Sequence, residues 1–443
     1  MRTRPTVTAA FILATLVTVV FSVQGVQAHE IPHTVRPGDT LASIAASYVE
    51  LADAYTKKEF IEEIKRVNNL GDRGLSVGMT LAIPVVRSEP LRPSSVKKPR
   101  DFVAKGAYIN QFTAGTRQVF TVARRLKACG GNTIVFDAKE VEGLPTYRSA
   151  VPREHLGLSS YAYTIEDIHK LVEYLHAMGM HVVARVCMFR DFYNSTNRAA
   201  WRFADEWVNP ANPAVQEYNL AIVRELLDSG VDEIQVDYFR YPADGKTQTG
   251  LEGKSRSDVL CDFARRLRGL TQAKGVVLSL DMFGIVIWQK KEDILILGQD
   301  VVRFKDHFDV ISPMLYPSHF VKNFSGVANP ADEPYLFVNR GVKRMKALVG
   351  DAVVIRPWLQ SFPLRVKIGY NAAYVRNQIH ATCDAGGTGW LLWSPKNRYE
   401  EAFRAMEGLD SKVCRPAVQR VGPARRAKEN LGSPRKNGRL TLN

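Results

Sequence analysis

The chain has 443 residues, a hydrophobic fraction of 45% and a formal net charge of +15 at pH 7. This length exceeds one average domain, and the hydrophobic fraction is that of an ordinary globular protein. The nine His and five Cys residues form neither a zinc-site spacing nor a disulfide framework, so we expect no metal, no other cofactor and at most one disulfide.

Residues 1–28 have the pattern of a secretory signal peptide. Arg2 and Arg4 precede an apolar run over residues 9–23, and Ala28 ends a small-residue cleavage site. A retained membrane anchor is the alternative, which the short apolar run disfavours. We therefore expect export to the periplasm, the cell envelope or the medium, where nucleic acid is not an expected partner.

Residues 31–86 follow the order strand, Gly-Asp turn, helix, helix, strand. The segment opens with Pro-Gly-Asp-Thr-Leu at 37–41, has Asn-Asn-Leu at 68–70 and closes with Gly-Met-Thr-Leu-Ala-Ile-Pro at 78–84. It resembles a LysM module with a longer middle. The resemblance implies binding to glycans that contain N-acetylglucosamine, such as peptidoglycan or chitin. Residues 87–103, which contain three prolines, form a predicted linker.

Residues 104–408 alternate eight β-branched runs with helical stretches, which is typical of a (β/α)8 TIM barrel. Predicted strands are 106–112, 132–140, 181–189, 233–242, 276–284, 309–317, 352–362 and 388–395. The helices predicted between them include 116–129, 164–178, 213–229 and 255–273. Thr164 and Asp167 predict a capping box, and Gly130, Gly179 and Gly230 predict helix ends.

Polar side chains gather where the predicted strands end, which is where TIM barrels place their chemistry. Side chains alternate between the two faces of a strand, so Asp237 shares a face with Gln235, Asp281 with Ser279, and Lys139 with Asp137. This count brings the following charged residues to one mouth: Asp137, Lys139, Arg185, Asp237, Arg240 and Asp281. A salt-bridge network that closes the barrel is the alternative, although apolar layers would serve stability alone.

Aromatic residues and one amide lie near the same strand ends. Sugar rings stack on aromatic faces, and carboxylates and amides bind hydroxyl groups. Some of these rings could instead fill the core, Trp390 in particular. The predicted substrate-binding residues are Lys139, Arg185, Arg240, Tyr316, Trp358, Gln360 and Trp393.

Four motifs support a family resemblance: Asn-Thr-Ile-Val-Phe-Asp-Ala-Lys at 132–139, Gln-Val-Asp-Tyr-Phe-Arg-Tyr-Pro at 235–242, Ile-Ser-Pro-Met-Leu-Tyr-Pro at 311–317 and Arg-Pro-Trp-Leu-Gln at 356–360. They resemble a bacterial glycoside hydrolase family distantly similar to the α-amylase superfamily. The resemblance places Asp237 at the nucleophile position. Asp281 stands where the α-amylase pattern has a Glu acid, and no residue matches the third acid on strand seven.

Strand spacing separates two catalytic schemes. Neighbouring strands lie about 4.8 Å apart, so the Asp237 and Asp281 carboxyls should be roughly 5–6 Å apart, which suits a retaining mechanism. Asp137 and Asp237 should be about 9–10 Å apart, nearer the inverting range. We predict Asp237 as nucleophile and Asp281 as acid/base. Lys139 and Arg185 would keep Asp237 ionised, and Asp137 would bind hydroxyls or orient Lys139.

The predicted function is hydrolysis of a bacterial surface glycan. A non-catalytic glycan-binding scaffold is the alternative, and a metal-dependent deacetylase is disfavoured because no His pair lies at the strand ends. Residues 409–443 form a predicted disordered tail with nine Lys or Arg residues and one Glu. This tail could contact an anionic surface.

Overall fold

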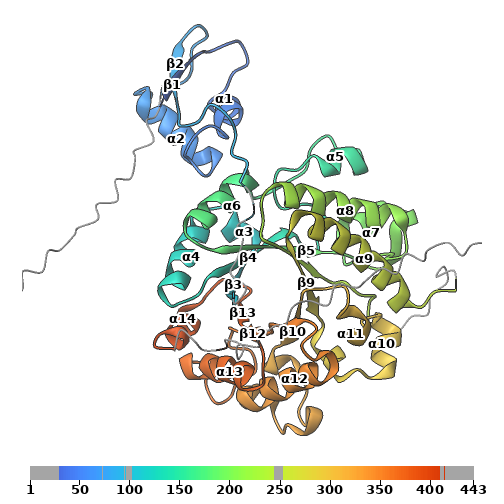
Figure 1. The fold of residues 1–443 in the computed structure, drawn as a ribbon. Coiled ribbons are helices and arrows are strands. Elements are labelled where there is room, and N and C mark those ends of the chain that lie inside the picture. The colour runs from blue at the N-terminus through green and yellow to red at the C-terminus, as the bar shows by residue number, and fades with distance from the viewer. Residues whose placement is uncertain are drawn as a thin grey trace, which may run out of the picture. The chain divides into compact units, whose positions relative to one another are not determined.

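The computed structural model describes residues 29–71, 73–93, 95, 102–243, 253–409 and 414 (Figure 1). The chain divides after Pro90 into two compact units, which we describe separately. The predicted signal peptide lies outside the described residues, as does the predicted tail from residue 410 onward apart from Cys414. No helix among the described residues is long and apolar enough to cross a membrane.

The first unit pairs two antiparallel strands with two helices. Its elements are β1 (His29–Thr34), α1 (Leu41–Tyr48), α2 (Lys57–Val67) and β2 (Thr80–Val85). A capping box between Thr40 and Ser43 starts α1. The longer middle is part of the fold, because Ala52 and Ala54 are buried in the same core as Phe60.

The second unit is a closed barrel of parallel strands. In the described part of the chain the strands follow one another around the barrel, and the last pairs with the first. The seventh position holds two short strands, since Pro357 between them has no N–H to donate to a ladder. The predicted TIM barrel is thus confirmed. In order around the barrel the strands are β3 (Lys105–Ile109), β4 (Thr133–Lys139), β5 (His181–Cys187), β8 (Glu233–Asp237), β9 (Val277–Met282), β10 (Val310–Leu315), β11 (Val354–Ile355) with β12 (Trp358–Gln360), and β13 (Trp390–Trp393).

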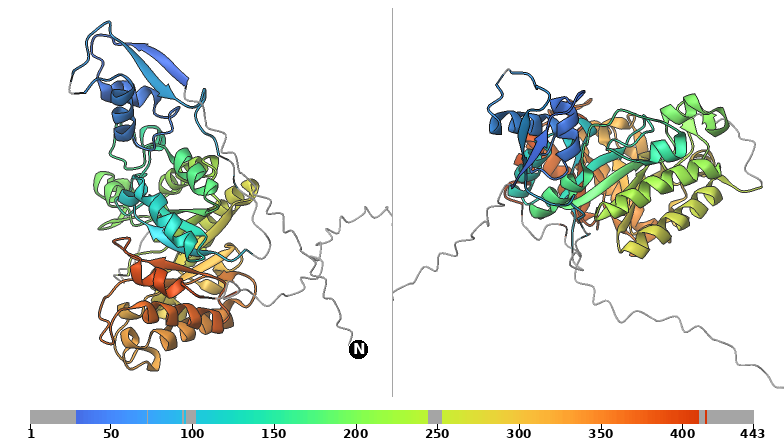
Figure 2. Two further views of the ribbon diagram at one scale, coloured as in Figure 1. Left: turned by 90° about the vertical axis from the view of Figure 1, so that its left-hand side faces the viewer. Right: turned by 90° about the horizontal axis from the view of Figure 1, so that it is seen from above.

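Helices cover the outside of the strands (Figures 1 and 2). The longer ones are α4 (Gln118–Ala128), α6 (Ile168–Ala177), α8 (Pro213–Asp228), α9 (Arg256–Lys274), α12 (Pro334–Val349) and α13 (Ala372–Asp384). Shorter elements are α3 (Gln111–Ala114), α5 (Val151–Leu156), α7 (Phe192–Asn197), β6 (Arg202–Ala204), β7 (Trp207–Val208), α10 (Lys291–Leu297), α11 (Val301–Phe304) and α14 (Glu400–Met406).

The helix ends test two predictions. Gly130, Gly179 and Gly230 follow their helices with φ of +82°, +74° and +85°, as expected for glycines at helix C-termini. The predicted capping box with Thr164 is wrong. Asp167 itself caps α6 by accepting from the Lys170 N–H, because the chain at Thr164 still runs beside Thr146 and bonds its carbonyl oxygen.

One disulfide joins α13 to the chain beyond the barrel. Cys383 is bonded to Cys414, with the Cα atoms 4.6 Å apart. The remaining thiols, Cys129, Cys187 and Cys261, are free. The sequence left room for one disulfide without assigning its cysteines.

The barrel interior has three levels. Glu233, His181 and Arg356 form a buried ionic cluster where the strands begin. Apolar side chains that include Val135 and Val183 follow. A second ionic cluster lies where the strands end, and it contains the predicted site.

Candidate active site

A cavity of about 430 Å³ opens at the C-terminal ends of the barrel strands. Its charged wall is formed by Arg185, Asp237, Arg240 and Asp281. The rest of the wall is mostly aromatic or apolar and includes Tyr238, Phe283, Met314, Tyr316, Phe320, Val321, Phe324 and Trp393. The cavity therefore combines a few charged groups with ring faces, as a ligand site requires.

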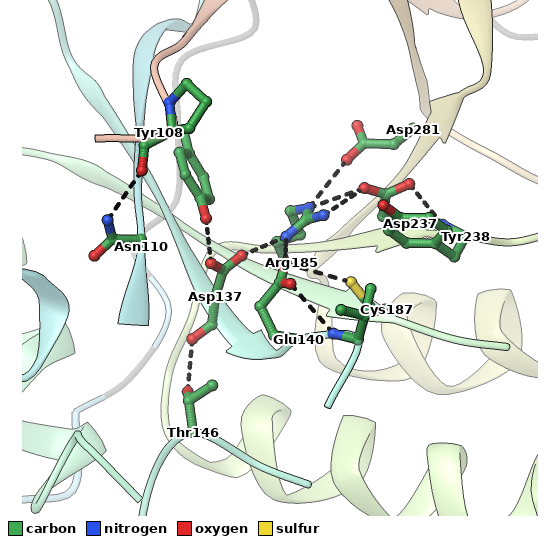
Figure 3. Close-up of polar contacts among 12 residues, drawn as sticks. Tyr108, Asn110, Asp137, Glu140, Thr146, Arg185, Cys187, Asp237, Tyr238 and Asp281 are labelled. Carbon is green, nitrogen blue, oxygen red and sulfur yellow. Dashed lines mark hydrogen bonds and ion pairs between the residues drawn. The ribbon is translucent and has the colours of Figure 1, made fainter. Parts of the chain in front are cut away.

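Arg185 lies at the centre of the charged groups (Figure 3). Its Nη1 is 2.5 Å from Asp137 Oδ1 and also contacts Glu140, and its Nη2 is 2.7 Å from Asp237 Oδ2. Its Nε lies 3.0 Å from Asp237 Oδ2 and 3.8 Å from Asp281 Oδ2. One guanidinium thus faces four carboxyl groups. Although burial alone disfavours the cation, the surrounding anions hold the pKa of Arg185 well above its usual range.

Asp237 is the last residue of β8, and three N–H groups fix its carboxylate. Arg185 donates two hydrogen bonds, and the backbone N–H of Tyr238 donates the third at 2.6 Å. Tyr238 adopts a left-handed backbone conformation with φ of +48°, which is costly for a residue other than glycine. The strand thus ends in a strained turn that points an N–H at the Asp237 carboxylate.

Asp281 on β9 has a different environment. Its Oδ1 accepts a 2.6 Å hydrogen bond from Trp358 Nε1, whereas its Oδ2 has no hydrogen-bond partner among the described residues. Burial and the negative charge of Asp237 raise the pKa of Asp281 well above its usual range, against the opposing effect of Arg185. The protonated form of Asp281 is therefore favoured, on the wall of the cavity.

Asp137 lies beneath this wall and is fully buried. Tyr108 donates a 2.5 Å hydrogen bond to its Oδ2, and Arg185 holds its Oδ1. Burial raises the pKa of Asp137 to about 7, although Arg185 opposes the shift. Asp137 therefore contacts Arg185 without lining the cavity, and the prediction that it binds hydroxyl groups or orients Lys139 is wrong.

Comparisons with known proteins identify both units. The model of a family described as "Putative glycosyl hydrolase domain" matches residues 106–399. The chain belongs to this family. A LysM domain model matches residues 33–84. The predicted glycoside hydrolase domain and LysM module are therefore confirmed. No curated protein matches the chain.

Several solved structures are similar to this chain. The PgaB (BpsB) glycoside hydrolase domain of Bordetella bronchiseptica is 14% identical, with a TM-score of 0.51 over 70% of this chain and 100% of that one. The Bacillus cereus spore cortex-lytic enzyme SleL is 12% identical, with a TM-score of 0.44 over 88% of each chain. An endo-β-1,4-mannanase from Thermotoga petrophila is 11% identical, with a TM-score of 0.45 over 66% and 68%. At these identities the likeness concerns the fold.

The glycosyl hydrolase domain brings together most of the predicted charged residues, but not Lys139. Asp137 pairs with Arg185 on β5 and Lys139 pairs with Val186, so two residues of β4 oppose one of β5. This bulge turns Lys139 outward, where its ammonium lies 3.1 Å from Asp191 and bonds the Cys187 carbonyl. The prediction that Lys139 shares the face of Asp137 is wrong.

Two further predicted substrate-binding residues are buried behind the wall. Trp358 is fully buried, and its indole N–H is used by Asp281. The Gln360 side chain accepts a hydrogen bond from the Ser318 N–H and donates one to the Phe362 carbonyl oxygen. It therefore links the segments after β10 and β12. The prediction that these two side chains line the mouth is wrong, because their strand turns them into the packed interior. The predicted residues Arg185, Arg240, Tyr316 and Trp393 do line the cavity.

Some site residues escaped the sequence analysis. The bulge that turns Lys139 outward also turns Glu140 inward, where it contacts Arg185. The pKa of Glu140 is lowered, because the effect of Arg185 outweighs that of burial. Tyr108 supports Asp137 and stacks on Trp393 with ring centroids 3.9 Å apart. Phe320 and Phe324 also line the cavity, and the aromatic residues of the segment after β10 were the sequence feature that could have indicated them. Among the described residues, no three His, Cys, Asp or Glu side chains form a group that could hold a metal ion.

Proposed function

We propose that the chain is a retaining glycoside hydrolase in which Asp237 is the nucleophile and Asp281 the acid/base. Oδ2 of Asp237 and Oδ2 of Asp281 lie 3.0 Å and 3.8 Å from the same Arg185 nitrogen. The two oxygens can therefore be separated by at most the two distances together, about 7 Å, which excludes most of the inverting range. This shared contact carries the proposal.

The environments of the two carboxyls suit these roles. Asp237, which accepts two hydrogen bonds from Arg185, would attack the anomeric carbon while Asp281 passes its proton to the glycosidic oxygen. The bond to the leaving sugar breaks, and a glycosyl ester forms on Asp237. Because the ester has no charge, the contribution of Asp237 to the raised pKa of Asp281 is removed, whereas that of burial remains. Asp281 then accepts a proton from the water that hydrolyses the ester.

The described geometry favours an enzyme over a non-catalytic scaffold. A network that served stability alone would be closed over by packed side chains. Asp281 Oδ2 instead accepts no hydrogen bond among the described residues, and Asp281 is one of the residues that line an open cavity.

We further propose that the enzyme is exported and acts at the cell envelope. The LysM domain supports this proposal, together with the signal-peptide pattern in residues 1–28. The LysM domain would hold the enzyme on insoluble glycan such as peptidoglycan, and the basic tail would add contacts with anionic polymer.

Incubation with purified wall glycans and exopolysaccharides tests the proposed function. Reducing ends and mass spectrometry report cleavage, and NMR of the first product reports its anomeric configuration. We expect cleavage with retained configuration by the wild type and none by Asp237→Asn. An inverted product would refute the retaining scheme. Binding of glycan by both proteins without any product would favour the scaffold.

A further inference from the structure

Two arginines line the cavity, and only one of them is neutralised. Arg185 faces four carboxyl groups, as described above. Arg240 makes no ion pair within 4.0 Å with any described residue, although it lines the same cavity as Asp237. Arg190, which contacts the same Tyr238 ring, is in contrast paired with Glu206 at 2.6 Å. Arg240 is therefore a cation of the cavity wall without an ion-pair partner among the described residues.

Aromatic rings surround the Arg240 guanidinium. Its central carbon lies 4.6 Å from the Phe283 ring centroid, 4.7 Å from that of Trp207 and 5.7 Å from that of Tyr238. Rings stabilise the flat faces of a guanidinium, but they do not satisfy the N–H groups along its edge. Among the described residues that edge makes a single hydrogen bond, from Nη1 to the Tyr241 carbonyl oxygen at 3.0 Å. Donors remain for a ligand.

The apolar surroundings make this arrangement costly without an anion. Burial lowers the pKa of Arg240 to about 10, although Asp237 opposes the shift. A guanidinium pairs with a carboxylate through two parallel N–H···O bonds, and such a pair is strongest where water is excluded. A bound carboxylate would thus compensate for the desolvation of Arg240.

We propose that Arg240 binds a carboxylate carried by the sugar at the catalytic centre, so that the substrate is a glycan containing acidic sugars. This inference rests on the proposed hydrolase function. It places the acidic group next to Asp237, because Arg240 follows the nucleophile by three residues and lines the same cavity.

Matched acidic and neutral glycans test this proposal. Hyaluronan, alginate, polygalacturonate and xanthan are each offered as such and after reduction of their carboxyl groups to alcohols, beside chitin, mannan and β-glucan. We expect the wild type to cleave at least one acidic glycan, with kcat/KM falling at least about tenfold on reduction of its carboxyl groups. Arg240→Gln should lose about 10²-fold on that acidic glycan and distinctly less on its reduced form.

Two variants control for structural effects. Arg240→Lys keeps the charge but lacks the planar fork, so it should retain part of the preference. Arg190→Gln removes a neighbouring positive charge that is already paired, and it should retain the full preference. Melting temperatures of all variants report whether the barrel is intact.

The outcomes separate the inference from the function it rests on. Cleavage of neutral glycans alone, or an unchanged acidic preference in folded Arg240→Gln, would overturn the acidic-sugar proposal and leave the hydrolase intact. A stronger preference for a sulfated glycan, dermatan sulfate with reduced carboxyl groups, would replace the carboxylate by a sulfate and also overturn it. No cleavage of any glycan by the wild type would refute the hydrolase itself.

Discussion

The two ionic clusters inside the barrel use similar residues and reach opposite balances of charge. At the strand starts, the Glu233 carboxylate accepts from Ser279, from His181 at 2.9 Å and from both terminal nitrogens of Arg356. The pKa of Glu233 is lowered to about 2, since these partners outweigh its burial. At the strand ends, four carboxyls share the single guanidinium of Arg185.

This difference separates stability from chemistry. A carboxylate with a full set of partners stabilises the fold, whereas one that shares its cation is left protonated or under-paired. Glu233, at the N-terminal end of the barrel, has such a set of partners, and this end of a TIM barrel is expected to serve stability. At the cavity, carboxyl groups share one cation, and burial and the charge of Asp237 raise the pKa of Asp281. Variants at the two ends of the barrel should therefore differ in whether stability or turnover is lost.

Asp237→Asn should have the largest effect on turnover. We expect a loss of at least about 10³-fold, which corresponds to several kcal/mol of transition-state stabilisation, with a normal fold. Arg185 keeps three other carboxyl neighbours in this variant, so the melting temperature should change by only a few degrees. Steady-state rates and thermal unfolding measure the two effects. Wild-type turnover by the variant would remove Asp237 from the mechanism.

Glu233→Gln should behave in the opposite way. It leaves the Arg356 guanidinium buried without its carboxylate, and breaking such a pair costs about 3–5 kcal/mol of folding free energy. The kcat of the folded fraction should stay within about threefold of wild type, because Glu233 lies at the other end of the barrel from the cavity. Chemical denaturation of the barrel tests the first effect. A stable variant with lost activity would contradict this division of roles.

The two ends should also respond oppositely to pH. Because the pKa of Glu233 is lowered from 4.5 to about 2, its stabilising contribution to the free energy of unfolding is present above pH 4.5 and is lost as pH falls towards 2. Because the pKa of Asp137 is raised from 3.8 to about 7, stability falls as pH rises between these values, by at most about 1.4 kcal/mol per pH unit.

Asp137→Asn separates these two contributions. The variant should show a smaller decline in stability between pH 4 and 7 than the wild type, since the raised pKa of Asp281 still contributes, but keep the acid-side loss, as measured by denaturation at a series of pH values. An identical profile in wild type and variant would show that Asp137 does not titrate in this range.

Trp358→Phe should have the smallest effect, and it tests positioning. The variant loses the N–H that bonds Asp281 Oδ1, and that hydrogen bond lowers the pKa of Asp281. We expect an activity loss of about tenfold and a shift of the alkaline limb of kcat/KM to higher pH. A rate loss without any shift of the pH profile would reduce Trp358 to a packing role.

The sequence predicted the parts of the site that depend on strand parity. Asp237 is the last residue of β8 and Asp281 the next to last of β9, so alternation and strand order place both of them at the mouth. Lys139 and Glu140 could not be assigned in this way, because the bulge in β4 exchanges their faces and the residue pattern shows no sign of it. The contact of Trp358 with Asp281 joins strands that are 77 residues apart in the chain, and it depends on packing across the barrel that alternation does not encode.

Covalent trapping tests the central claim most directly. The enzyme is incubated with activated 2-fluoro glycosides of neutral and acidic sugars, which slow hydrolysis of a glycosyl ester, and its peptides are analysed by mass spectrometry. The account predicts a fluoroglycosyl adduct on the peptide that contains Asp237, and none in Asp237→Asn. An adduct on another carboxylate, or turnover with inverted configuration and no adduct, would contradict it.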